Sequence, residues 1–178
     1  MFEKTGDAKY QLAAEKLRAQ LTDHPKTSNG AYWHKKIYPH QLWLDGVYMG
    51  MPYLAYYSQL FENGASLKQV VHEFEITRQM LRDPVTGLYF HAWDESKSMN
   101  WADPATGRSK FFWSRGIGWL GMALVDVLEK NNGVHPGFRR NHAKGVCVIG
   151  HFESSGEARV FSSAQVFNEP QTPVGLPL

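Results

Sequence analysis

Residues 46–62 form the stretch that most limits what this chain can fold into. Along one face of this stretch, residues recur at the spacing of an α-helix. They are Val47, Met51, Leu54, Ser58 and Phe61. The other faces are nearly as apolar, because they carry Tyr48, Tyr53, Tyr56, Tyr57 and Leu60. A helix that is apolar all round is buried on most of its sides, so other elements of the chain must pack around it.

The same spacing predicts three further helices, over residues 7–22, 65–82 and 114–131. A long connection follows the first of them, over residues 24–44, and an extended, aromatic-rich piece follows the third. The order is helix, loop, helix, helix, loop, helix. This alternation predicts an all-α fold of stacked helical hairpins, with the functional loops gathered at one end.

The character of the sequence changes after Asn132. Residues 133–178 are rich in Gly, Ser, Pro and Arg and show no helical period. We therefore expect a helical domain over residues 1–132, followed by an irregular and poorly packed tail over residues 133–178.

Composition excludes several classes of function. The 178 residues suffice for one domain with a core, and 19 basic against 17 acidic residues give a net charge of +2. No basic stripe is present, so a nucleic-acid partner is not expected. Cys147 is the only cysteine, which excludes an intrachain disulfide and a cysteine-based zinc site. The polar start and the lack of any stretch of ~20 apolar residues predict a cytoplasmic protein with no membrane partner.

A single carboxylate, Asp45, lies among apolar residues in HQLWLDGVYMG, residues 40–50. Burying a lone carboxylate is costly unless it is paired, hydrogen-bonded or protonated. One interpretation is therefore a general acid held in an aromatic pocket with a raised pKa. The other, which the spacing favours, is an N-cap for the helix that follows.

Three histidines accompany this carboxylate. His91, in LYFHAWDES, is either a substrate-binding residue or a core histidine bonded to the backbone. His34 and His40 precede Asp45, but their spacing matches no standard zinc motif and HExxH is absent, so no metal site is expected.

A second informative stretch is FFWSRGIGWLG, residues 111–121. Trp113 and Arg115 can point into one cleft, and Trp119 lies one helical turn beyond Arg115. Glycine inside a helix destabilises it unless a neighbour approaches closely, and this stretch has Gly116 and Gly118. An acid, a cationic clamp, histidines and indole rings together suit a small acidic sugar. No phosphate loop, GxGxxG or GxSxG is present.

Two segments carry a family resemblance: YWHKKIYPHQLWLDG, residues 32–46, and FWSRGIGW, residues 112–119. They are similar to the unsaturated rhamnogalacturonyl hydrolases of glycoside hydrolase family 105, which are related to the unsaturated glucuronyl hydrolases of family 88. The resemblance covers about residues 3–131. It implies an (α/α)6 barrel of twelve helices with the active site at one mouth, of which about four barrel helices are visible here.

The resemblance also implies a reaction and a site. The family removes a 4,5-unsaturated uronic acid from pectin-derived oligosaccharides by protonating its vinyl ether, without a metal or organic cofactor. By matching motif, Asp45 corresponds to the catalytic acid/base, and His34 and His91 are expected near the substrate. Arg115 is expected near the uronate. The pocket walls are implied to be Trp43, Trp113 and Trp119.

This sequence departs from the family pattern in two respects. The family has a second active-site aspartate on an earlier helix, which nothing upstream of Asp7 supplies, and only a third of the barrel is recognisable. We therefore interpret the chain as a fragment with little or no activity alone, with self-association expected through exposed barrel faces. Two alternatives stay open: a non-catalytic carbohydrate-binding module, and action on unsaturated glucuronyl disaccharides.

Overall fold

The structure is a computed structural model that describes residues 1–131 of the chain. The tail predicted over residues 133–178 lies outside the described residues. The elements in chain order are α1 (Phe2–Thr5), α2 (Ala8–Thr22), β1 (Gln41–Trp43), α3 (Leu44–Phe61), α4 (Leu67–Leu81), β2 (Ala92–Asp94) and α5 (Ser114–Asn131). Within the described part of the chain, the four long helices α2 to α5 confirm the predicted helical fold and its long connections.

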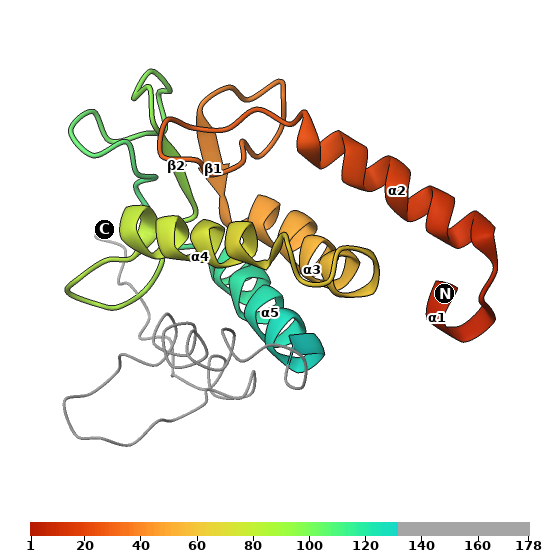
Figure 1. The fold of residues 1–178 in the computed structure, drawn as a ribbon. Coiled ribbons are helices and arrows are strands. Elements are labelled where there is room, and N and C mark those ends of the chain that lie inside the picture. The colour runs from red at the N-terminus through yellow and green to blue at the C-terminus, as the bar shows by residue number, and fades with distance from the viewer. Residues whose placement is uncertain (132–178) are drawn as a thin grey trace, which may run out of the picture.

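The apolar stretch forms α3, which packs against both α4 and α5 (Figure 1). The core lies where these three helices meet, as the all-round apolar pattern predicted. Its buried side chains include Leu44, Val47, Met51, Leu54, Val70, Phe74, Leu81, Leu120, Leu124 and Val127. The helix α3 ends at Phe61, and the backbone of Asn63 and Gly64 then turns to positive φ, 49° and 80°.

The first long helix, α2, differs from its prediction in packing. Asp7 is its N-cap and accepts a hydrogen bond from the Lys9 backbone amide. However, none of its residues is buried, and Leu17, which belongs to the apolar helical spacing of residues 7–22, is 49% exposed. In Figure 1, α2 lies to one side of the three core helices, where the Tyr53 hydroxyl of α3 donates to its Ala14 carbonyl at 2.6 Å. A helical period therefore identified the helix correctly but not what covers its apolar side.

A short antiparallel ribbon lies at the start of α3. β1 pairs with β2 in the register Gln41↔Asp94, Leu42↔Trp93 and Trp43↔Ala92. The prediction of one long connection over residues 24–44 missed β1. Since β1 leads directly into α3, this pairing fixes the first turn of α3 beside the segment that carries His91.

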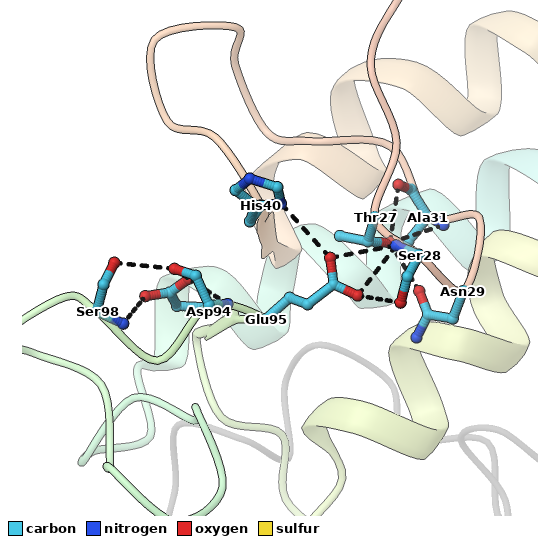
Figure 2. Close-up of polar contacts among 9 residues, drawn as sticks. Thr27, Ser28, Asn29, Ala31, His40, Asp94, Glu95 and Ser98 are labelled. Atoms are coloured by element: carbon cyan, nitrogen blue, oxygen red, sulfur yellow. Dashed lines mark hydrogen bonds and ion pairs between the residues drawn. The ribbon is translucent and has the colours of Figure 1, made fainter.

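Two loops next to this ribbon are tied together by buried or partly buried carboxylates (Figure 2). Glu95 accepts hydrogen bonds from the backbone amide and hydroxyl of Ser28, and its carboxylate lies 3.6 Å from His40 Nδ1. Asp94 is fully buried and accepts backbone amides of the loop that follows it, including that of Ser98 at 2.9 Å. Burial raises the pKa of Asp94, but hydrogen bonds from the Ser96 hydroxyl and from these amides together outweigh it and leave the pKa below its ordinary value. The carboxylates thus hold the loops at one end of the helices.

The two Asp-Pro-x-Thr-Gly segments, residues 83–87 and 103–107, form matching turns. Asp83 and Asp103 each accept hydrogen bonds from the amide and hydroxyl of the threonine three residues later. Gly87 and Gly107 close the turns at positive φ, 75° and 78°. Among residues 1–131, no helix combines the length and apolar character needed to cross a bilayer.

Candidate active site

The lone carboxylate of residues 40–50, Asp45, lies in the first turn of α3. The capping interpretation is wrong, because α3 begins at Leu44 with Trp43 as N-cap, and no side chain forms a cap hydrogen bond. The end of a helix still suits this residue, since the helix dipole favours negative charge near its N-terminus. The carboxyl group is therefore not engaged by the backbone amides that it was expected to cap.

The His91 side chain faces this carboxylate. Asp45 Oδ2 and His91 Nδ1 are 3.6 Å apart, and the two side chains are 22% and 20% exposed. Both atoms are buried, and among the described residues neither has a hydrogen-bond partner. The His91 carbonyl accepts the Leu44 amide at 3.1 Å, which joins the two segments directly. This is a pair of polar atoms that a bound molecule can satisfy.

His34 approaches the same turn from the long loop. Its ring stacks on Trp43 with centroids 4.6 Å apart and planes within 7°. A Cβ added at Gly46 would lie 2.9 Å from His34 Nδ1, so the glycine after Asp45 is what allows this approach. His34 Nδ1 is another buried atom without a hydrogen-bond partner in residues 1–131.

Sequence reasoning missed two aromatic neighbours of Trp43. Tyr38 is nearly parallel to Trp43 at 5.4 Å, and Trp101 meets it edge-on at 6.2 Å. Trp43 also meets the His91 ring at 5.0 Å. Tyr38 lies within the quoted YWHKKIYPHQ stretch, whereas nothing near Trp101 in the sequence marks it. Because Trp43 packs against these other rings, less of its indole face is available to stack on a sugar ring.

The start of α5 contributes Trp113 and Arg115. The Trp113 ring meets His91 edge-on at 4.7 Å, and the Arg115 guanidinium lies 3.9 Å above the Trp113 ring. Gly116 also has the predicted close neighbour, since an added Cβ would lie 3.1 Å from His91 Nδ1. For Gly118 that expectation is wrong, because nothing lies within 4 Å.

Trp119 is not brought into this cluster by any ring contact that the structure records. It packs on Tyr48 of α3, with centroids 4.7 Å apart. The other predicted site residues are linked by direct contacts: Asp45 to His91, His91 to Trp43 and Trp113, Trp113 to Arg115, and Trp43 to His34.

The electrostatics of the site favour neutral imidazoles. Burial lowers the pKa of His91, Arg115 lowers it further, and the Asp45 carboxylate opposes both. Burial likewise lowers the pKa of His34, with Lys35 adding to the effect and Asp45 opposing it. A neutral imidazole can accept or donate one hydrogen bond at each nitrogen according to its tautomer. Among the described residues, no group of three or more His, Cys, Asp or Glu side chains is placed to hold a metal ion.

This arrangement joins a carboxyl group, two imidazoles and a guanidinium in one connected cluster of side chains. A carboxyl group can donate a proton, and a guanidinium offers a planar fork to a carboxylate. The geometry is therefore suited to acid chemistry on a small anionic molecule.

The chain is similar to known glycoside hydrolases. Residues 1–143 match the model of Glycosyl Hydrolase Family 88. The chain is 41% identical to a solved glycoside hydrolase from family 105 of C. acetobutylicum, with a TM-score of 0.77 over 83% of this chain and 40% of that one. It is 29% identical to the unsaturated rhamnogalacturonyl hydrolase YesR of Bacillus subtilis, over 75% of this chain and 39% of that protein.

A shorter similarity is of another kind. Over 69 residues the chain is 36% identical to a catalase-related peroxidase of Synechococcus elongatus, which covers 34% of this chain and 20% of that protein. That share is too small to show a second family. The chain spans about 40% of the length of the family 105 structure and of YesR. On the match of residues 1–143, the chain belongs to Glycosyl Hydrolase Family 88, with family 105 enzymes among its structural relatives.

Proposed function

We propose that this chain carries the proton-donating part of a hydrolase site that removes 4,5-unsaturated galacturonic acid from pectin-derived rhamnogalacturonan oligosaccharides. The observation that carries the proposal is the approach of Asp45 Oδ2 to His91 Nδ1, 3.6 Å apart. Both atoms are buried, and among the described residues neither has a hydrogen-bond partner. The relative YesR is an unsaturated rhamnogalacturonyl hydrolase, which supports the substrate class. The partner is thus a small acidic oligosaccharide.

The proposed reaction is the hydration of a vinyl ether. Asp45 gives its proton to C4 of the unsaturated ring, water adds its hydroxyl group at C5, and the remaining proton of the water passes to the Asp45 carboxylate, which is thereby restored to the acid. The resulting hemiketal opens, and the rest of the oligosaccharide leaves as the aglycone. This route needs one positioned acid, unlike glycoside hydrolysis between two flanking carboxylates.

Each neighbouring side chain has a role in this proposal. Arg115 binds the uronate carboxylate, and stacking on Trp113 holds its guanidinium in place. His91, neutral because of its lowered pKa, contacts the substrate or the attacking water without adding a second positive charge beside Arg115. His34 and Trp43 form one wall of the pocket.

Asp45→Asn tests the proposal. The purified chain and the variant are incubated with an unsaturated galacturonyl–rhamnose disaccharide, and loss of the ultraviolet absorbance of the conjugated acid is followed. Binding is measured in parallel by NMR. We expect binding by both proteins. Because the chain spans only about 40% of its relatives, we expect a loss of absorbance that is slow and that requires Asp45. Asp126→Asn is the matched control, because it makes the same chemical change on a different helix, α5. It should behave like the unmodified chain.

The same experiment separates an enzyme from a binding module. Binding by the unmodified chain with no Asp45-dependent loss of absorbance would contradict the proposed hydrolase and favour a non-catalytic carbohydrate-binding fragment.

Unsaturated glucuronyl disaccharides are the second candidate substrate, because the family model that matches this chain is that of family 88. Comparing the two disaccharides in the same assay decides between them.

A further inference from the structure

One buried ionisable group takes no part in the proposed chemistry. Glu73, in the middle of α4, is 1% exposed. Its two carboxyl oxygens lie 3.2 and 3.1 Å from the backbone nitrogen of Tyr32, which donates to them. A carboxyl group in a core is costly compared with an apolar side chain of similar size. Its presence therefore needs a reason beyond packing.

Tyr32, the partner of Glu73, is the first of three consecutive residues whose backbone amides each donate a hydrogen bond. The Tyr32 amide donates to Glu73, the Trp33 amide to the Pro25 carbonyl at 3.0 Å, and the His34 amide to the Gln41 carbonyl at 2.7 Å. The last two acceptors are backbone groups. Among residues 1–131, Glu73 is thus the side chain that accepts one of these amides, while His24 Nε2 lies 2.8 Å from the Trp33 carbonyl oxygen.

Other side chains on the same face of α4 form hydrogen bonds with the preceding residues of the loop. Gln69 Nε2 donates to the Gly30 carbonyl at 3.3 Å, and His72 Nε2 lies 2.9 Å from the Asn29 carbonyl oxygen. Residues 69, 72 and 73 recur at helical spacing, so they share one side of the helix. The loop is consequently held against α4 along its length before it reaches the site.

From these contacts we propose that Glu73 is a positioning residue: by holding the Tyr32 amide, it sets the place of His34 against Trp43 and Gly46. The relevance of His34 to the substrate rests on the proposed function, but the positioning itself does not. The tolerance is narrow, because His34 Nδ1 would lie only 2.9 Å from a Cβ at Gly46. A loop free to shift by a fraction of an ångström would alter this contact and the stack on Trp43.

The hydrogen bond between the Tyr32 amide and Glu73 can be detected through the ionisation of Glu73. Burial raises the pKa of Glu73 to about 8, while the Tyr32 amide and Lys26 act in the opposite direction. In the unmodified chain, the NMR signal of the Tyr32 amide should therefore move as Glu73 ionises. This movement should be absent in Glu73→Gln, whose amide oxygen can still accept the Tyr32 hydrogen bond.

The readout at the site is the pKa of the His34 imidazole, identified among the histidine signals by its loss in His34→Gln. We expect Glu73→Gln to keep this pKa below its ordinary value. Glu73→Leu, which cannot accept the Tyr32 amide, should let water reach His34 and raise the pKa towards that value. Thr77→Val is the control, because Thr77 is buried on α4 but donates to the Glu73 carbonyl at 2.7 Å and not to the loop.

The outcomes distinguish the two proposals. If the Tyr32 amide does not respond to pH, or if Glu73→Leu folds and leaves the His34 pKa unchanged, the positioning role is overturned. A Glu73→Leu variant that does not fold leaves the decision to the Tyr32 titration in the unmodified chain. If both His34 and Tyr32 respond as expected but no disaccharide is bound or hydrolysed, the positioning role stands and the proposed function fails.

Discussion

Asp45 and His91 face each other closely enough that the charge of one should be measurable in the titration of the other. The Asp45 carboxylate raises the pKa of His91 against the effects of burial and Arg115. Asp45→Asn removes only this favourable contribution. We expect the pKa of His91 to fall further below its ordinary value, measured by NMR titration of the imidazole.

The control for this prediction is Asp126→Asn, which makes the same change of charge elsewhere on the described helices. It should leave the His91 titration where it is in the unmodified chain. An unchanged His91 pKa in Asp45→Asn would mean that the 3.6 Å approach in the structure does not represent the chain in solution.

The glycine that follows Asp45 gives a second prediction at this scale. In Gly46→Ala the added Cβ would meet His34 Nδ1 at 2.9 Å and His34 Cα at 3.3 Å. Forcing such a contact in a packed region costs about 1–3 kcal/mol. We therefore expect a lower free energy of unfolding in urea.

Gly50→Ala is its matched control, since Gly50 lies one turn further along α3 and nothing is within 4 Å of an added Cβ. There, replacing glycine in a helix should stabilise the chain by about 0.5–1 kcal/mol. Equal effects of the two substitutions would show that His34 does not lie where the structure has it.

At the scale of elements, α4 carries a pH dependence of stability. The pKa of Glu73 is about 8 in the folded chain, against an ordinary value of 4.5. Between these two pH values the folded chain holds a proton that the unfolded chain has lost. The stabilisation is therefore fully present below about pH 4.5 and is lost as pH rises to about 8, a change on the order of a few kcal/mol.

Glu73→Gln should remove this slope. The measurement is the free energy of unfolding at several pH values from 5 to about 8.5, taken as the difference between the unmodified chain and the variant. Glu75→Gln, on the exposed side of the same helix, should keep the slope. Parallel curves for the unmodified chain and Glu73→Gln would contradict a protonated, buried Glu73.

The elements also show which parts of the structure were predictable from the sequence. The helical period located α3, α4 and α5, because their apolar faces meet in one core. It could not locate β1, since a strand of three residues forms only by pairing with β2, about fifty residues further along the chain. The same reason hid Trp101 beside Trp43 and Glu73 beside Tyr32. For Asp45, local spacing favoured a cap, whereas the pairing of β1 and β2 places its carboxyl group beside His91.

At the scale of the whole molecule, the described residues expose an apolar face that the helices do not cover. On α5, Gly118, Met122 and Val125 recur at helical spacing, and the two larger side chains are 48% and 56% exposed. Large apolar side chains gathered on one exposed face favour association. The chain also spans only about 40% of its solved family 105 relative, whose remaining length has no counterpart in the match.

We therefore predict that the chain self-associates through this face of α5, with a second copy as the partner. Val125→Glu places a charge in the middle of the face, where burying it without a partner is costly, and should shift the chain towards monomer in sedimentation measurements. Val85→Glu is the matched control, because Val85 is 89% exposed in the turn after α4. Dissociation by both variants would indicate a general effect of charge, and a monomeric unmodified chain at all concentrations would contradict the prediction. If Val125→Glu alone dissociates the oligomer, the apolar period of α5 identifies a surface that contacts another copy, while its first turn supplies Arg115 to the site.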